Sequence, residues 1–315
     1  MVRAIGPPMR IGWSIPHRSI EPIDVGEVGH VARRAEELGV DDLWVTNNPL
    51  DHDAHCLDSL GVLNFVAGQT ERVRLGVSVL VLPVYHPVHV AHSVASLDLL
   101  SGGRVTLGVG LGRPDELRQF QVPSGRRVGR FLEQIAVMRA LWAGETVTTS
   151  SDGDEPWFEL EQASMRLRPV QRPHPPLWFG GVHPDAIARA ARHAEGWMSA
   201  GGASTESFAT GLAAIEEALA TAGRDRSSFT VSKRLFMAVH DDPDVARAEV
   251  RRWYGEVYGS ADHAEISGVF GTLDDVRDQI QEIAAMGPDH LLLNPITRHR
   301  DHVELDPELI SGLSR

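Results

Sequence analysis

The densest group of chemically active side chains lies in TNNPLDHDAH, residues 46–55, directly after a predicted strand. Its last five residues, DHDAH, combine two aspartates with two histidines, which are residue types that ligate a metal ion in barrel hydrolases. Such a site also needs ligands from other strand ends. The last predicted strand ends at Asn294 instead of a carboxylate. A metal-dependent hydrolase is therefore the less favoured interpretation, and we expect no metal.

A glycine-rich segment, GVGLG at residues 108–112, follows another predicted strand. It is half of a dinucleotide fingerprint, but Arg113 occupies the position of the last glycine. No strand ends in an acidic residue about 20 residues later, as ribose recognition requires. The glycines therefore indicate either a tight turn or the close approach of the backbone to a flat ligand.

Two further glycine-rich loops precede predicted helices. FGGVHPD, residues 179–185, places Pro184 near the first turn of one helix, and SAGGAST, residues 199–205, leads into the next. Free amides at a helix N-terminus, reached through glycines, can bind an anion. Ordinary helix capping is the alternative, and two adjacent loops of this kind favour a phosphate site.

One polar residue interrupts the buried-strand pattern of RVRLGVSVLVLP, residues 72–83. A nearly continuous Val/Leu run predicts a strand that is covered on both faces. Ser78 lies in its middle. Its hydroxyl either is satisfied inside the core or marks a contact with a ligand.

The elements that position these residues alternate between strands and helices along the whole chain. Eight strand–helix units predict an α/β fold with a parallel sheet. Their number favours a (β/α)8 TIM barrel with its site at the C-terminal ends of the strands, and an open doubly wound sheet is the alternative. Residues 145–175 interrupt the pattern, which predicts an insertion region with a hairpin inside one domain, 1–315. The strands are predicted at 10–15, 41–46, 72–83, 104–110, 176–181, 195–202, 229–240 and 289–295.

The composition of the chain argues against several classes of binding partner. A formal net charge of -13 argues against a nucleic acid or an anionic membrane. One cysteine cannot form a disulfide within the chain, and no apolar stretch approaches the ~18 residues of a membrane span. We expect a cytoplasmic protein with a small-molecule substrate. Lys233 is the only lysine among the 30 basic residues, which suggests a GC-rich genome.

Residues 75–112 resemble the signature region of the bacterial luciferase-like monooxygenase superfamily. The block LGVSVLVLPVYHPVHVAHSVASLDLLSGGRVTLGVGLG contains a glycine-led strand, VLP, HPV, a helix end of the form LD.LS.GR and a glycine-rich strand end. PPLWFGGVHPDAIARAARHAEGW, residues 175–197, is similar to its second hallmark. ALWAGE at 140–145 and GTLDDVRDQI at 271–280 agree in order and spacing. The resemblance therefore covers nearly the whole chain.

This resemblance implies a barrel that binds coenzyme F420 or reduced FMN at the strand C-termini. The tricyclic ring of these cofactors typically rests on a bulge with a non-prolyl cis peptide, which maps to Ser78–Val79. The strand end at Gly110, Leu111 and Gly112 would approach the ring. The phosphate would lie on the loops after the fifth and sixth strands, which map to Gly180, Gly181, Val182, Ser199, Gly201 and Gly202.

The end of the second strand departs from the family pattern. Many F420-dependent members carry an Asp-His pair there, where this chain has Asn47 and Asn48. Neither amide can transfer a proton, although either can hydrogen-bond a substrate. His17, His52 and Glu116 are the other candidates for proton transfer.

A second departure bears on the cofactor. The luciferases hold the FMN phosphate with an arginine after the fourth strand, and the matching position here is Leu111, with Arg113 two residues on. This difference and the GC-rich composition favour an F420-dependent oxidoreductase that transfers hydride between the deazaflavin C5 and a small organic substrate.

An FMNH2-dependent flavin monooxygenase is the main alternative, in which the pocket shields a reactive oxygen adduct from water. A non-catalytic cofactor-binding relative is another, because both amides lack acid–base chemistry. A homodimer is expected from the resemblance. Residues 145–170 and 259–271 and the loop after the seventh strand would set substrate specificity.

Overall fold

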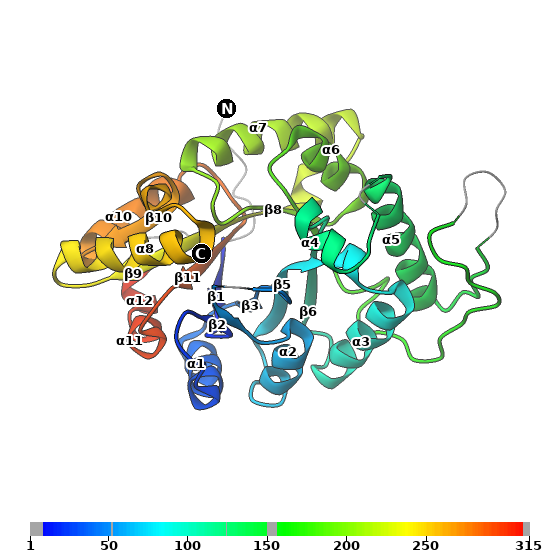
Figure 1. The fold of residues 1–315 in the computed structure, drawn as a ribbon, viewed down its shortest axis with the longest axis horizontal. Helices are drawn as coiled ribbons and strands as arrows, with labels where there is room; N and C mark the ends of the chain where they lie inside the picture. The colour runs from blue at the N-terminus through cyan, green and yellow to red at the C-terminus, as the bar shows by residue number, and fades with distance from the viewer. Residues whose placement is uncertain (1–8, 52, 124, 150–155, 311–315) are drawn as a thin grey trace.

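Eight parallel strands close into a barrel, which confirms the predicted (β/α)8 fold and rules out the open sheet. The computed structural model describes residues 9–51, 53–123, 125–149 and 156–310. The first and last barrel strands are hydrogen-bonded to each other, and helices surround the barrel (Figure 1). In chain order the barrel strands are β1 (Arg10–Ser14), β3 (Asp42–Val45), β5 (Arg74–Val81), β6 (Val105–Gly110), β7 (Leu177–Gly180), β8 (Gly196–Ser199), β9 (Thr230–Val239) and β11 (His290–Pro295).

Helices between successive strands cover the barrel, with their apolar faces buried against it. Their ends follow local sequence signals. Thr272 and Asp275 form a capping box at the start of α10, and α1 ends at Gly39, whose φ of 86° favours glycine. The covering helices are α1 (Val25–Leu38), α2 (Ser59–Ala67), α3 (Pro87–Leu100), α5 (Arg127–Ala143), α6 (Pro184–His193), α7 (Thr205–Thr221), α8 (Pro243–Tyr258) and α10 (Leu273–Ala284).

Several short elements lie outside this regular pattern, and of these only a short C-terminal helix was predicted. β10 (Gly268–Gly271) pairs with the C-terminal half of β9, so the segment after α8 adds a short strand beside the barrel. β2 (Arg18–Ser19) and β4 (His55–Cys56) form a small antiparallel pair. The other short elements are η1 (Leu82–Val84), α4 (Pro114–Gln119), η2 (Arg226–Ser228), η3 (Ala261–His263), α9 (Ala264–Ser267), α11 (His299–Glu304) and α12 (Asp306–Leu309).

The predicted insertion lies beyond α5 (Figure 1). An isolated antiparallel bridge joins Val147 to Ala163. The Thr149 hydroxyl donates to the carbonyl of Phe158 (2.6 Å) and accepts from the amide of Leu160 (2.8 Å). These contacts agree with the expected hairpin, whose residues 150–155 lie outside the described part of the chain.

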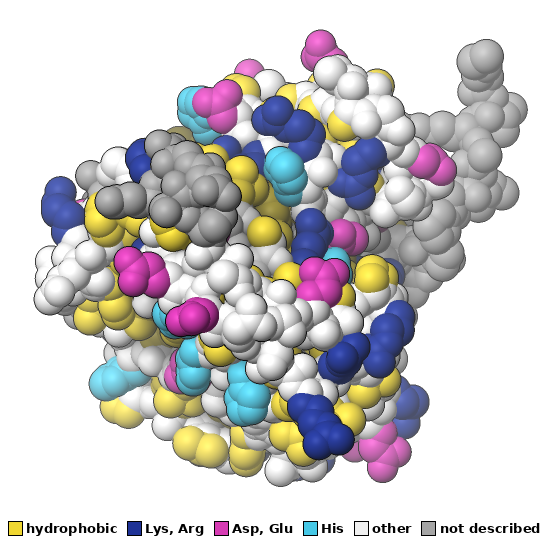
Figure 2. Space-filling view, turned by 90° about the vertical axis from the view of Figure 1, so that its right-hand side faces the viewer, with side chains coloured by type: hydrophobic (Ala, Val, Ile, Leu, Met, Phe, Trp, Pro, Cys, Tyr) yellow, Lys and Arg dark blue, Asp and Glu magenta, His cyan; other side chains and the backbone are white. Residues whose placement is uncertain are grey.

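Figure 2 shows the face of the molecule that lies on the right-hand side of Figure 1. On this face, basic and acidic side chains are mixed rather than separated by sign.

Two tryptophans fill the barrel interior, and glycines on neighbouring strands make room for them. A Cβ at Gly76 would lie 2.3 Å from the Trp44 ring, and one at Gly196 would lie 2.6 Å from the Trp178 ring. The two rings stack with their centroids 5.2 Å apart. Gly76 in β5 and Gly196 in β8 therefore serve packing inside the barrel.

A buried carboxylate closes the N-terminal end of the barrel. Asp42 is fully buried, and its oxygens lie 3.8 Å from Nε of Arg10, 3.9 Å from Nε of Arg74 and 3.7 Å from Nε2 of His290. These separations exceed hydrogen-bonding distance. Burial raises the pKa of Asp42 to about 6, and the two arginines only partly oppose this shift.

Replacing Asp42 by asparagine is expected to change how stability depends on pH. Because the folded-state pKa is raised, the folded chain holds this proton more tightly than the unfolded chain, and the resulting stabilisation is lost as the pH rises through about 6. Between about pH 5 and about pH 7.5 the wild type should lose roughly 1 kcal/mol more stability than Asp42→Asn. Urea unfolding of both proteins at the two pH values measures this difference, and parallel losses would contradict the prediction.

Candidate active site

A bulge interrupts β5 where it pairs with β6. The register shifts between Val77 and Leu80, and the Ser78–Val79 peptide is cis. The cis peptide expected from the resemblance is therefore present. Val79 is half-buried and packs on the interior cluster that contains Trp44 and Trp178. The bulge thus presents a β-branched side chain at the C-terminal mouth of the barrel.

Glycines on the next two strands surround the Val79 side chain. A Cβ at Gly110 would lie 2.7 Å from Val79 Cγ2, and a Cβ at Gly180 or Gly108 would lie 2.9 or 3.2 Å from Cγ1. Contacts below 3.0 Å are too close for real carbon atoms, so these strand ends require residues without side chains. Gly110 of GVGLG and Gly180 of FGGVHPD therefore accommodate Val79, a reason that neither the turn nor the ligand interpretation included.

The Asn47 side chain hydrogen-bonds the end of β5 and the segment that follows it. It is 4% exposed, its Oδ1 accepts a hydrogen bond from the amide of Val81 (3.1 Å), and its Nδ2 donates to the Tyr85 hydroxyl (3.0 Å). Both ends of the amide are thus used within the protein. Asn48 is half-buried, and its backbone hydrogen-bonds Cys56.

The variant Asn47→Leu is expected to lower the free energy of unfolding by about 1–3 kcal/mol. Leucine has a similar size but leaves the buried amide of Val81 without its acceptor. Thermal or urea unfolding measures the loss. Asn64→Leu is the control, because that amide lies on the exposed side of α2 and bonds only the carbonyl one turn back. Equal effects of the two substitutions would contradict the role given to Asn47.

His17 is buried with both ring nitrogens engaged. Nδ1 donates to the carbonyl of Ile15 (2.8 Å), and Nε2 accepts from the amide of Thr46 (2.6 Å) and lies 2.8 Å from its hydroxyl. Burial, with a smaller contribution from Arg234, lowers the pKa of His17 to about 3. The neutral ring therefore links the end of β1 to the end of β3.

Glu116 lies on α4, directly after β6. Its carboxylate faces the loop at Gly112, where a Cβ would be 3.4 Å from Glu116 Oε2, and Gly112 itself has a φ of 68°. Burial raises the pKa of the Glu116 carboxyl, with Arg113 opposing it. Leu111 is half-buried in the same loop. His52, the third predicted proton donor, lies outside the described residues.

The loops after β7 and β8 lead into helices that side chains already cap. His183 Nδ1 accepts from the amide of Asp185 at α6, and Ser204 accepts from Ser207 at α7. Gly181 has a φ of 148°, and Val182 is exposed. Capping thus accounts for part of the pattern, and the glycine amides before each cap lie where the sequence places a phosphate.

Two buried polar side chains lie next to the loop after β8, one at the end of β8 and one on β9. Ser199 is 3% exposed, and its hydroxyl has no hydrogen-bond partner among the described residues. Lys233 on β9 reaches under the loop and donates to the carbonyl of Ala203 (2.5 Å). Burial lowers the pKa of Lys233 to about 8. Gly201 is buried, and a Cβ there would meet the Phe236 ring at 2.5 Å, whereas Gly202 is half-buried.

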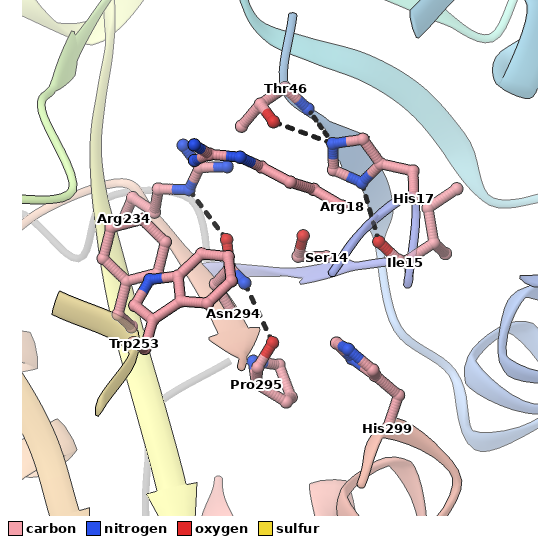
Figure 3. Close-up of a pocket in the computed structure, with 11 residues that line it drawn as sticks. Ser14, Ile15, His17, Arg18, Thr46, Arg234, Trp253, Asn294, Pro295 and His299 are labelled. Carbon is pink, nitrogen blue, oxygen red and sulfur yellow. Dashed lines mark hydrogen bonds between the residues drawn. The ribbon is translucent and has the colours of Figure 1, made fainter. Parts of the chain in front are cut away.

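A small pocket opens at the ends of four other strands (Figure 3). Arg234 on β9 lines this pocket. Its Nε donates to Asn294 Oδ1 (3.0 Å), and its Nη1 donates to the carbonyl of Ser78 (3.2 Å). Arg234 therefore connects β9, β11 and the bulge of β5. Ser14, His17, Thr46 and His299 also line the pocket.

Sequence reasoning did not single out Arg234 or His299. The available signal was the pair Lys233–Arg234 inside the apolar run FTVSKRLFMAVH, because charged residues within a buried strand need internal partners. His299 follows β11 and is 7% exposed. Burial lowers its pKa to about 3.

Two other features bear on the predicted partners. Within the described part of the chain, no three His, Cys, Asp or Glu side chains gather closely enough to hold a metal ion. Over the same residues, none of the helices has the length and apolar character that crossing a membrane requires.

The sequence model of a family described as luciferase-like monooxygenase matches residues 9–290. The chain belongs to this family. The prediction drawn from residues 75–112 and 175–197 is therefore confirmed, and the chain is an enzyme of the luciferase-like family of oxidoreductases.

Several luciferase-like relatives are similar over most of their length. The chain is 34% identical over 297 residues to an F420-dependent glucose-6-phosphate dehydrogenase from Beutenbergia cavernae, covering 89% of this chain and 85% of that protein. It is 31% identical over 254 residues to an F420-dependent glucose-6-phosphate dehydrogenase from Microbacterium testaceum, covering 78% and 73%.

Solved structures share the luciferase-like fold. An F420-dependent secondary alcohol dehydrogenase in complex with an F420-acetone adduct superposes with a TM-score of 0.81 at 22% identity, covering 97% of this chain and 98% of that one. A monooxygenase from Streptomyces bottropensis superposes with a TM-score of 0.79 at 24% identity, with the same coverage. At these identities the likeness concerns the fold.

Proposed function

We propose that this enzyme is a coenzyme F420-dependent oxidoreductase that transfers hydride between the deazaflavin C5 and a small organic substrate. The observation that carries the proposal is the bulge of β5, set among glycines at the barrel mouth, in a chain 34% identical to an F420-dependent dehydrogenase. When bound, the deazaflavin supplies a carbon centre that accepts or gives a hydride.

The bulge provides a seat for a flat ring. Val79 is fixed from below by the interior tryptophan cluster and from the sides by Gly110 and Gly180. Arg234 holds the carbonyl of Ser78 from the opposite strand. A ring seat fixed by several strands orients one face of the ring toward the substrate and excludes water from the other.

The loops after β7 and β8 fit a phosphate. The glycines near 180–181 and 201–202 precede the N-termini of α6 and α7, where anions are favoured, although the amide of Gly181 already donates to the carbonyl of Met198 (3.3 Å). The unpartnered hydroxyl of Ser199 can donate to a phosphate oxygen, and Lys233 supplies positive charge beneath the loop. We propose that these residues hold the phosphate of the cofactor.

Glu116 is the residue we propose for proton transfer. It is half-buried beside the glycine-rich end of β6, burial raises the pKa of its carboxyl, and a carboxyl side chain can both give and take a proton. His17 is less suited, because both ring nitrogens are bonded and its pKa lies near 3.

Fluorescence titration of the purified chain with F420 and with FMN tests the proposal. Saturable F420 binding in the micromolar range, with weaker FMN binding, is expected. Tight FMN binding without F420 binding would replace the proposal by the flavin monooxygenase alternative.

We also propose that the enzyme is a cytoplasmic homodimer. Light scattering of the purified protein measures the mass of the assembly.

A further inference from the structure

Arg234 is a buried cation without a carboxylate partner among the described residues. It is 8% exposed, and its Nη2 atom is buried with no hydrogen-bond partner in that part of the chain. Nε and Nη1 are used by Asn294 and by the carbonyl of Ser78, both neutral groups. An arginine carries five N–H donors and seldom leaves a buried nitrogen unbonded.

Among the described residues no carboxylate compensates the charge of Arg234, whose guanidinium lies over the Phe236 ring with its Cζ 5.1 Å from the centroid. Asp51 is already paired with Arg18, whose Nε lies 2.5 Å from Asp51 Oδ2. His17 is neutral in this setting. Burial lowers the pKa of Arg234 to about 10, so the guanidinium stays charged at neutral pH. A buried charge of this kind is unfavourable unless an anion or a charged hydrogen bond completes it.

A second unpartnered atom lines the same pocket. His299 Nδ1 is buried and has no hydrogen-bond partner among the described residues. In Figure 3, Arg234 and His299 approach the pocket from different sides, with Ser14 between them in that view. The space inside is about 10 Å³, roughly the room of one water-sized group. The pocket therefore has the size and the polar atoms for a single oxygen.

We propose that this pocket binds an anionic oxygen of the substrate, one oxygen of a small carboxylate, through Nη2 of Arg234. This inference rests on the proposed function, because Nη1 of Arg234 bonds the carbonyl of Ser78 at the proposed ring seat. An oxygen on Nη2 therefore lies beside that seat. A charge-assisted hydrogen bond from a buried guanidinium is among the stronger polar contacts in proteins.

Acetate serves as the probe in calorimetric titration of the full chain at constant ionic strength. Wild type should bind acetate at one site, with inorganic phosphate present throughout to occupy the loops after β7 and β8. Arg234→Met should weaken acetate binding about 10- to 100-fold. Arg247→Met is the matched control, because that arginine is exposed and pairs with Glu265 at 3.6 Å. Its affinity for acetate should equal that of wild type.

The variant Arg234→Lys covers the case in which Arg234→Met does not fold. It keeps the charge but loses the planar fork, so acetate should bind about tenfold more weakly. Unchanged acetate affinity in either folded variant overturns the proposal. A fall in F420 affinity with acetate binding intact also overturns it, because Arg234 would then contact the cofactor. A wild-type chain that binds acetate but not F420 would contradict the proposed function while leaving the anion pocket standing.

Discussion

The variant Gly110→Ala is expected to have an affinity for F420 at least about tenfold lower than that of the wild-type chain. The added Cβ would lie 2.7 Å from Val79 Cγ2. Valine is stiff at χ1, so its side chain cannot turn away freely and the bulge of β5 must move instead. Because the proposed ring seat is this bulge, the displacement acts on cofactor affinity. Fluorescence titration with F420 measures it.

A double-mutant cycle separates this mechanism from general damage to the barrel. Val79→Ala removes the methyl group that Gly110→Ala would meet, so the double variant should bind F420 more tightly than Gly110→Ala and about as tightly as Val79→Ala alone. Gly129→Ala is the control, because a Cβ there has its nearest neighbour 3.7 Å away, at Nε1 of Trp157. Wild-type affinity in Gly110→Ala, or a double variant no better than Gly110→Ala, would refute the ring seat at Val79.

Replacing Arg104 by methionine is expected to lower the free energy of unfolding by about 3–5 kcal/mol. Arg104 is 8% exposed and donates to oxygens of Ala67, Thr70, Val73 and Ser101 at 2.6–3.1 Å. These bonds tie the end of α2 and the loop before β5 to the end of α3. Methionine fills a similar volume but leaves the buried oxygens without a donor.

Urea unfolding measures this loss, and Arg72→Met serves as the control. Arg72 is exposed and makes one long contact, at 3.5 Å, with the carbonyl of Glu36, so its loss should change stability by less than about 0.5 kcal/mol. F420 affinity of the folded Arg104→Met protein should stay near the wild-type value. A stable variant that fails to bind F420 would instead assign Arg104 to the cofactor site.

The role of Arg104 explains part of the signature that identifies the family. In the motif LD.LS.GR, Asp98 is buried and accepts from the amides of Val170 and Gln171, which attaches the end of the insertion to α3. Ser101 and Arg104 complete the network. These residues hydrogen-bond α3 to the insertion and to neighbouring loops of the barrel. The motif that identifies the family therefore reflects the packing of the fold.

The fold could be predicted because the signals are local. Short apolar runs bounded by turn residues mark the barrel strands, and the count of eight favours closure. The segment GTLDDVRDQI at 271–280, which agrees with the family in order and spacing, contains the start of α10 at Leu273. The short β10, by contrast, carries only four residues, and its pairing with β9 depends on tertiary contacts.

The site was only partly predictable, because its contacts join distant residues. The loops at strand ends were expected, and the cis peptide at Ser78–Val79 followed from the family resemblance. A glycine in a sequence does not reveal which side chain it makes room for, so Val79 was missed as the reason for Gly110. Arg234 contacts Ser78, 156 residues away, and Asn294, 60 residues away.

A crystal structure of the chain with bound F420 tests the central claim most directly. The account predicts the deazaflavin ring in contact with Val79 at the cis bulge and the phosphate at the loops of Gly181 and Ser199. A ring bound away from Val79, or a phosphate held by other loops, would contradict it.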